Sequence, residues 1–174
     1  MATPGSPSLA ARVIRALLAG DDNEGNVSEI LHFEDFHVGQ TFSFGAYEVT
    51  KEEIVEFASQ FDPQPHHLDE EAGKKTILGG LSASGWHVCS MVMRMMVDNL
   101  VVRMANRGGV GAREGRWMKP VRPGDVLRLE VEVAELTEPK SLPGVGFVTF
   151  DARVFNQREQ VAFLSMTPIV ARRG

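Results

Sequence analysis

One segment restricts the possible folds of this chain more than any other: residues 84–106, SGWHVCSMVMRMMVDNLVVRMAN. It contains no proline and is apolar almost all round when its residues are placed on a helix. A helix with so little polar surface is usually buried in a core. GGLSASG precedes the segment and supplies Ser84 as an N-cap, so the sequence predicts one long buried helix that begins there.

Strand patterns lie on both sides of this helix. Residues 39–51, GQTFSFGAYEVTK, alternate apolar and polar side chains, with a shift near Gly45 that indicates a β-bulge. From residue 111 onward, β-rich runs are separated by the turn clusters RPGD, TEPKSLPG and NQRE. This order of strand, helices and strands predicts an α+β fold, in which an antiparallel sheet wraps around one long buried helix. That arrangement is the hotdog fold.

A shorter helix is predicted between the first strand and the long helix. Thr50 followed three residues later by Glu53 forms a capping box, and Ile54, Phe57, Ala58 and Phe61 share one face of KEEIVEFASQF. This helix would deliver Asp62 at its C-terminal end.

The first residues of the chain differ from the rest. Residues 1–20 contain two arginines and no acid, with apolar residues at helical spacing, and DDNEGN follows as a polar linker. We expect residues 1–30 to be an amphipathic arm and linker that docks on its own domain or on a partner chain. Residues 31–174 are then expected to form a single domain.

Composition excludes several classes of function. The net charge of −5 argues against nucleic acid as the main partner, and no apolar run reaches the roughly 18 residues of a membrane span. A single cysteine, Cys89, rules out an intramolecular disulfide and favours a reducing compartment, so we expect a cytoplasmic protein. A lone sheet of this kind would leave edges exposed and its helix partly uncovered, which predicts a homodimer.

The stretch FDPQPHHLD, residues 61–69, contains the most reactive side chains. Pro63 and Pro65 disfavour helix before them, so the segment is expected to be extended, with His66 and His67 pointing in opposite directions. An aspartate and a histidine can share acid–base work, yet the same residue types are common in turns. The residues alone leave both interpretations open.

Other candidates are weaker. No phosphate loop, no GxSxG motif and no metal-ligand cluster occurs, and adjacent histidines have poor geometry for one metal ion, so neither a metal nor a cofactor is expected. His87 and most of the methionines of the long segment are expected to pack in the core. Ser84 and Gly85 either only cap the helix or also contribute to a site.

Several motifs in the same order give the chain a family resemblance. Asp62, Gln64, Pro65 and His67 fall on the pattern Asp-x-Asn-Pro-x-His, in which the acid and the histidine are five positions apart. FEDFHVGQTF, GGLSASGW and MKPVRPGDVL match elsewhere, so that the similarity covers about residues 33 to 171. The chain resembles the MaoC-like dehydratases, relatives of the (R)-specific enoyl-CoA hydratases.

The resemblance implies reversible syn addition of water to a 2-enoyl thioester, with coenzyme A as part of the substrate and no separate cofactor. It assigns acid–base roles to Asp62 and His67 and the oxyanion-hole N–H to Gly85. By position, Ser84 and Trp86 are expected to contact the substrate together with Gln64, although Gln64 replaces the family's asparagine and Ser84 a frequent histidine. The alternatives are a hotdog thioesterase, against which the paired histidine weighs, and a non-catalytic acyl-binding protein, which the two replacements favour.

Overall fold

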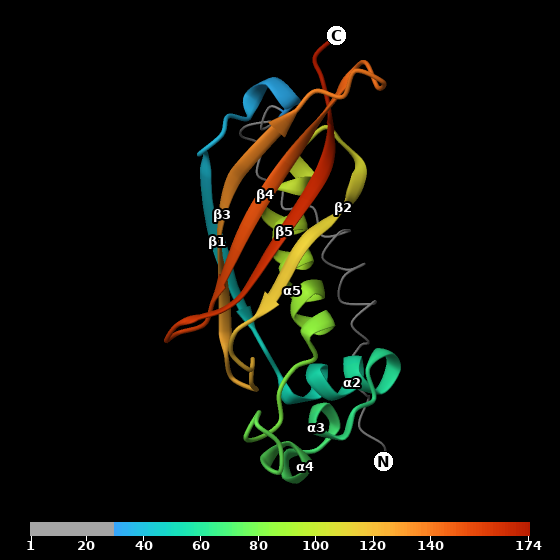
Figure 1. Cartoon of the computed structure of the whole chain (residues 1–174). Helices are drawn as coiled ribbons and strands as arrows, with labels where there is room; N and C mark the ends of the chain where they lie inside the picture. Colours follow the sequence, from blue (N-terminus) through green and yellow to red (C-terminus); the bar gives the residue numbers. More distant parts are fainter. Residues whose placement is uncertain (1–29) are drawn as a thin grey trace, which may run out of the picture.

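A curved antiparallel sheet wraps around one helix in the computed structural model, which describes residues 30–174. The strands are β1 (Thr41–Glu48), β2 (Asn106–Trp117), β3 (Val126–Thr137), β4 (Val145–Phe155) and β5 (Gln160–Ala171). They pair in the order β1-β3-β4-β5-β2, and the helix α5 (Gly85–Asn99) lies against the concave face (Figure 1). The predicted α+β hotdog architecture is confirmed. The expected N-terminal arm lies outside the described residues.

The alternation of apolar and polar residues along the strands sets the core. Leu127, Leu129, Val131 and Val133 of β3 are buried, and they fall on one face as the period of two requires. The predicted bulge in β1 is also present, because the register against β3 shifts between Gly45 and Tyr47. A bulge adds twist to an edge strand, which helps β1 to follow the curve of the sheet.

The long helix is shorter and more exposed than the sequence predicted. It ends at Asn99 and is followed by the 3-10 turn η2 (Val101–Arg103), and residues 106–110 belong to β2. Its exposed residues include two large hydrophobic ones, Trp86 and Met93, so the helix is not buried all round. The early start of β2 was missed because RGGVG carries no alternation of apolar and polar residues, and every residue of this edge strand is exposed.

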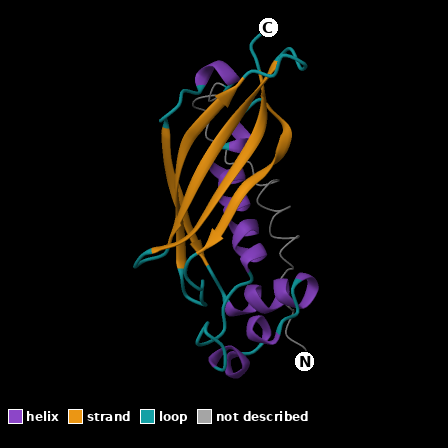
Figure 2. Cartoon of the chain, viewed as in Figure 1, coloured by secondary structure: helices purple, strands orange, loops and turns teal. Residues whose placement is uncertain are grey.

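Three helices lie together at one end of the sheet (Figure 2). They are α2 (Lys51–Phe61), α3 (Pro65–Leu68) and α4 (Glu70–Lys74), and they connect β1 to α5. The 3-10 turn η1 (Phe33–Asp35) lies near the opposite end (Figure 1). Within residues 30–174, no helix has the length and apolar character needed to cross a membrane.

Candidate active site

Asp62 lies where α2 ends and is held from two sides. The helix begins as predicted, with the Thr50 hydroxyl accepting a hydrogen bond from the Glu53 N–H at 3.2 Å. At its other end the Ser84 hydroxyl donates to Asp62 Oδ2 at 2.6 Å, and the Gln64 amide donates to Asp62 Oδ1 at 2.8 Å. Gln64, which replaces the asparagine of the family pattern, therefore still orients the acid.

The buried face of α2 is narrower than predicted. Ile54 and Ala58 are buried, Phe57 is partly buried, and Phe61 is exposed. Phe61 is the last helical residue, and it contacts the Phe57 ring with 5.1 Å between centroids. An apolar ring left at the surface directly beside a polar site is available to contact a ligand.

The segment that carries the histidines is helical, so the predicted extended conformation is wrong from Pro65 onward. Pro65 occupies the first position of α3, where its missing N–H costs no hydrogen bond and its fixed φ suits the helix. The rings of His66 and His67 therefore contact each other edge to face, with 4.2 Å between centroids, and do not point in opposite directions. They still differ in environment, since His67 is buried and His66 is partly exposed.

One hydrogen bond fixes the tautomer of His67. Its Nδ1 lies 2.8 Å from the Ser82 carbonyl oxygen, which can only accept, so the Nδ1–H donates and Nε2 carries the lone pair. That Nε2 faces Asp62 Oδ2 at 3.7 Å. The separation is too long for a direct hydrogen bond. A small molecule with hydrogens to donate, such as water, could be held by both atoms.

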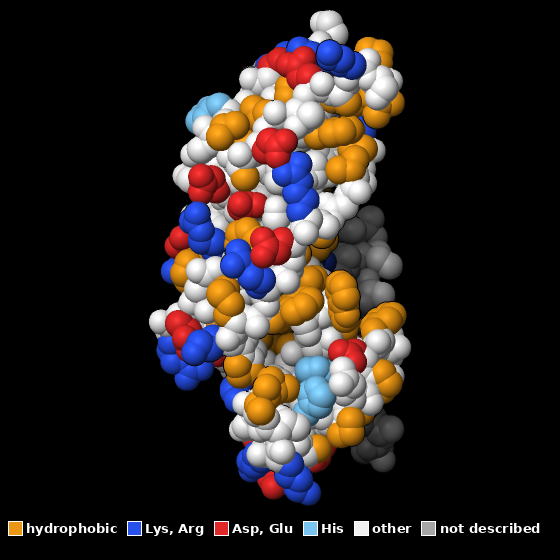
Figure 3. All heavy atoms as spheres, in the orientation of Figure 1, with side chains coloured by type: hydrophobic (Ala, Val, Ile, Leu, Met, Phe, Trp, Pro, Cys, Tyr) orange, Lys and Arg blue, Asp and Glu red, His pale blue; other side chains and the backbone are white. Residues whose placement is uncertain are grey.

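The environment of Asp62 favours its ionised form. The hydrogen bond from the Ser84 hydroxyl, followed by that from the Gln64 amide, holds the pKa of the Asp62 carboxyl below its usual range. The site thus combines an ionised carboxylate with a histidine nitrogen that can accept a proton. Figure 3 shows histidine side chains at the surface in the region of the short helices, beside an acidic side chain and among hydrophobic ones.

The N-terminus of α5 adds a backbone donor to this pair. Ser84 is the N-cap as predicted, and its hydroxyl accepts from the Trp86 N–H at 3.3 Å while donating to Asp62. Its expected contact with substrate stays a prediction. Gly85 is the first helical residue, a position whose N–H has no partner within the helix. The positive end of the helix dipole lies at the same point.

The indole ring of Trp117 packs against Gly85. The Trp117 indole N–H donates to the Gly85 carbonyl oxygen at 2.9 Å, and a Cβ on Gly85 would come within 2.6 Å of the indole ring. The glycine therefore admits a ring that any side chain would displace. Trp86 lies edge-on to Trp117 at 5.9 Å, and its predicted contact with substrate stays a prediction.

Sequence reasoning missed one polar cluster next to this site. Glu53 Oε1 accepts a hydrogen bond from the Tyr47 hydroxyl and lies 3.3 Å from His87 Nε2. The His87 ring stacks on Phe57 at 4.6 Å. Burial raises the pKa of Glu53, but the hydrogen bonds from His87 and Tyr47 outweigh it and leave the pKa below its usual range. Burial and Glu53 together raise the pKa of Tyr47.

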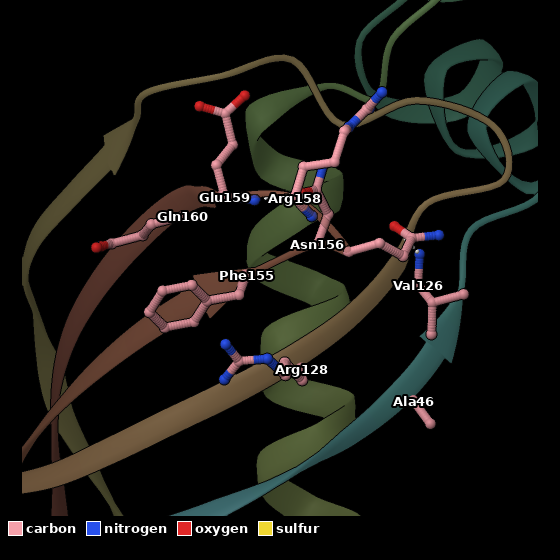
Figure 4. Close-up of a pocket in the computed structure, with 9 residues that line it drawn as sticks. Ala46, Val126, Arg128, Phe155, Asn156, Arg158, Glu159 and Gln160 are labelled. Atoms are coloured by element: carbon pink, nitrogen blue, oxygen red, sulfur yellow. Dashed lines mark hydrogen bonds between the residues drawn. The ribbon is translucent and has the colours of Figure 1, made fainter.

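A separate hollow of about 550 Å³ lies away from this site (Figure 4). Arg128 and Phe155 line it, together with the β4–β5 turn. Because Leu127 and Leu129 face the core, Arg128 between them faces away from α5. The hollow therefore belongs to the outer surface of the sheet, and it contains none of the predicted site residues.

Comparisons with known proteins identify the family and agree with the fold. The family model of the MaoC like domain matches residues 35–145. The crystal structure of the MaoC-like dehydratase from Rhodospirillum rubrum has 39% identity and a TM-score of 0.73, and covers 83% of this chain and 99% of that one. A Mycobacterium tuberculosis protein with a double hotdog fold superposes with a TM-score of 0.69 at 16% identity, covering 82% of this chain and 44% of its own, which shows the fold alone.

A curated relative is also named for a dehydratase activity. The 3-hydroxybutyryl-CoA dehydratase of Methylorubrum extorquens is 32% identical over 109 residues, which make up 62% of this chain and 66% of that protein. The family match spans most of the described domain and includes Asp62, His67 and Gly85. This chain belongs to the MaoC-like domain family.

Proposed function

We propose that this protein is a hydratase or dehydratase that interconverts a 2-enoyl thioester and its 3-hydroxyacyl thioester, with coenzyme A as the thiol. One observation carries the proposal: His67 Nε2, freed by the Nδ1–H bond to Ser82, faces Asp62 Oδ2 across 3.7 Å. The names of the Rhodospirillum rubrum and Methylorubrum extorquens relatives support a dehydratase. A cytoplasmic location remains part of the proposal.

In the hydration direction, both groups would hold one water molecule. Asp62 accepts a hydrogen bond from one water hydrogen and aims the oxygen at the β-carbon. His67 Nε2 takes the other proton as the C–O bond forms, and returns it to the α-carbon. Because Asp62 and His67 hold the water on one face of the substrate and His67 returns the proton from that same face, the hydroxyl and the proton add to the same side of the double bond, which gives syn addition.

The thioester oxygen becomes negative as water adds. The Gly85 N–H, at the positive end of the α5 dipole, is the donor that we assign to this oxygen. Water bonds to the β-carbon and no hydride or electron is transferred, so the reaction needs no cofactor beyond the substrate's own coenzyme A. The dehydration direction uses the same groups in reverse order.

The test follows two signals from crotonyl-CoA and longer 2-enoyl-CoAs: loss of the conjugated thioester and release of free thiol. We expect hydration without thiol release. Asp62→Asn and His67→Ala should each lower kcat by about 10²- to 10⁴-fold. His66→Ala is the matched control, because it removes the adjacent histidine, which lacks the Ser82 bond, and it should retain most of the turnover.

Three results would contradict the proposal. Release of thiol without hydration would assign the protein to the thioesterases. Full turnover by Asp62→Asn would remove the acid–base pair from the mechanism. Binding of 2-enoyl-CoA without any turnover would instead favour a non-catalytic acyl-binding protein.

A further inference from the structure

Glu53 connects three elements through a single oxygen atom. Its Oε1 accepts from the Tyr47 hydroxyl of β1 and is 3.3 Å from His87 Nε2 of α5, while Glu53 itself belongs to α2. The Glu53 side chain is 20% exposed and that of His87 is 4% exposed. Hydrogen bonds to a carboxylate that is largely shielded from water are among the stronger ones in a protein.

The two ends of α2 are attached to the same turn of α5. Near its start, Glu53 reaches His87, and directly after its last residue, Asp62 accepts from Ser84. Phe57, one turn after Glu53, stacks on the His87 ring and lies on the same side of the helix. A helix attached at one end can pivot about that contact. Because α2 is attached at both ends, its distance from α5 and its rotation about its own axis are fixed.

We propose that Glu53 is a positioning residue, whose contacts with His87 and Tyr47 set the place of the Asp62 carboxylate relative to His67 and to the Gly85 N–H. The inference rests on the proposed function, since it extends the same site. It also assigns a use to His87, a buried residue to which the proposed mechanism gives no role.

The geometry at Glu53 offers two informative variants. Glu53→Ala removes both contacts and lets the α2–α5 junction relax. Glu53→Gln retains an Oε1 that can accept both hydrogen bonds but carries no charge, so it separates position from charge. Glu52→Ala is the matched control, because it removes an exposed carboxylate from the neighbouring position of the same helix.

Turnover is the first readout. Glu53→Ala should lower kcat by about 10- to 100-fold with KM close to that of the wild type, since displacements of catalytic groups by about 1 Å cost factors of this size. Glu53→Gln should recover most of the loss, and Glu52→Ala should match the wild type. A fall in melting temperature with kcat unchanged, measured well below that temperature, would reduce Glu53 to a structural residue and overturn the proposal.

The second readout does not depend on turnover. The pKa of Asp62, followed by NMR titration, should rise toward its ordinary value in Glu53→Ala as the bond from Ser84 loosens, and should stay low in Glu53→Gln. An unchanged Asp62 pKa in Glu53→Ala would overturn the positioning role. If the wild type hydrates no thioester, the proposed function fails, and the Asp62 titration still decides the role of Glu53.

A milder variant covers the case in which Glu53→Ala does not fold. Tyr47→Phe removes only one of the two donors to Glu53. It should shift kcat and the Asp62 pKa in the same directions by smaller amounts. No change in either quantity would count against the proposal.

Discussion

At the scale of single residues, Ser84 combines two functions in one hydroxyl group. The oxygen accepts from the Trp86 N–H, which caps α5, and its hydrogen is donated to Asp62. A hydroxyl can do both because it has one proton and two lone pairs. One oxygen atom therefore both caps the N-terminus of α5 and favours the ionised form of Asp62.

Replacing Ser84 should change the pH at which Asp62 loses its proton. The Ser84 bond is the main cause of the low pKa of Asp62, so Ser84→Ala should raise that pKa. Loss of this hydrogen bond removes the larger of the two contacts that favour the ionised carboxylate. The Asp62 carboxyl, followed by NMR titration, should therefore titrate at higher pH in Ser84→Ala than in the wild type.

The free energy of unfolding should also depend on pH through the Asp62 pKa. A lowered Asp62 pKa stabilises the fold above the pKa of the unfolded chain, and this contribution is lost as the pH falls through the folded pKa. Ser90→Ala, which removes another hydroxyl from α5 that bonds only to the Trp86 carbonyl, is the control. An Asp62 titration that stays in place in Ser84→Ala would show that the Ser84 bond is not what lowers the Asp62 pKa.

Gly85 offers a steric test. An alanine Cβ at this position would lie 2.6 Å from the Trp117 indole, which must move away and lose its bond to the Gly85 carbonyl. Gly85→Ala should lower kcat at least about tenfold, through displacement at the oxyanion site, and change the tryptophan fluorescence. Adding Trp117→Leu should recover part of the turnover if the clash is the cause.

A second glycine provides the comparison. Gly109→Ala places its Cβ 3.6 Å from the nearest atom, an ordinary contact, and should change little. Equal losses for the two alanines would point to a general effect of the substitution and not to the site.

The site residues that could be predicted from the sequence all belong to short motifs of neighbouring residues. The spacing of Asp62 and His67 and the cap at Ser84 can be read along the chain, because prolines, caps and motif order are short-range features. The sequence places Glu53 in a capping box with Thr50. In the structure the Glu53 N–H bonds to the Thr50 hydroxyl, but the Glu53 side chain contacts Tyr47 and His87 instead of completing the box. His87 lies far along the chain from Glu53, and local sequence patterns do not predict a contact between residues so far apart.

At the scale of elements, α5 illustrates how periodicity can overstate burial. Its methionines occur so densely that the sequence indicates apolar character all round, but Met91 is 1% exposed while Met93 is 46% exposed. The sheet covers only part of the helix circumference. The expectation that most of these methionines pack in the core is confirmed, since Met91, Met95, Met96 and Met104 are buried and Met93 is the exception.

These two methionines make a matched pair for stability. Met91→Ala should lower the free energy of unfolding by about 2–5 kcal/mol, because it leaves a cavity beneath the sheet. Met93→Ala should change it by less than about 0.5 kcal/mol, as is usual at exposed positions. Urea denaturation of both variants gives the comparison, and similar losses would mean that Met93 is covered in solution.

The histidine segment shows why element type can be missed in short stretches. Pro65 was a reason to expect extended chain, but the same fixed φ suits the first turn of a helix, and only the surroundings decide between the two. Here the Ser82 carbonyl, from the loop before α5, holds the His67 ring and stabilises the helical turn. Whether this segment is extended or helical depends on tertiary contacts, so local propensity alone is compatible with both conformations.

At the scale of the whole molecule, the strand order leaves β1 and β2 at the two edges of the sheet. All 12 residues of β2 are exposed, and an open edge of this length is a template for pairing with another chain. The homodimer stays a prediction, and β2 is the edge that we expect to form it.

A charge on that edge should weaken the dimer. Val110→Lys places a lysine in the middle of β2, and lysine on an edge strand opposes pairing with a second chain. Sedimentation should then show a larger dissociation constant than for the wild type. Val102→Lys, at an equally exposed valine outside the sheet, is the control, and a dimer unaffected by Val110→Lys would locate the interface elsewhere.

The order of the strands also has a consequence for how the molecule assembles. β3, β4 and β5 pair with their neighbours along the chain, whereas β1 and β2 must each find a distant strand across the sheet. Loop closure makes such distant pairings slow, so we infer that a three-stranded meander forms early and the edges join it later. Asp62, His67 and Gly85 all lie on the connection between β1 and β2. The candidate active site would then be among the last parts to form, so a protein with a complete site is one in which all five strands have already paired.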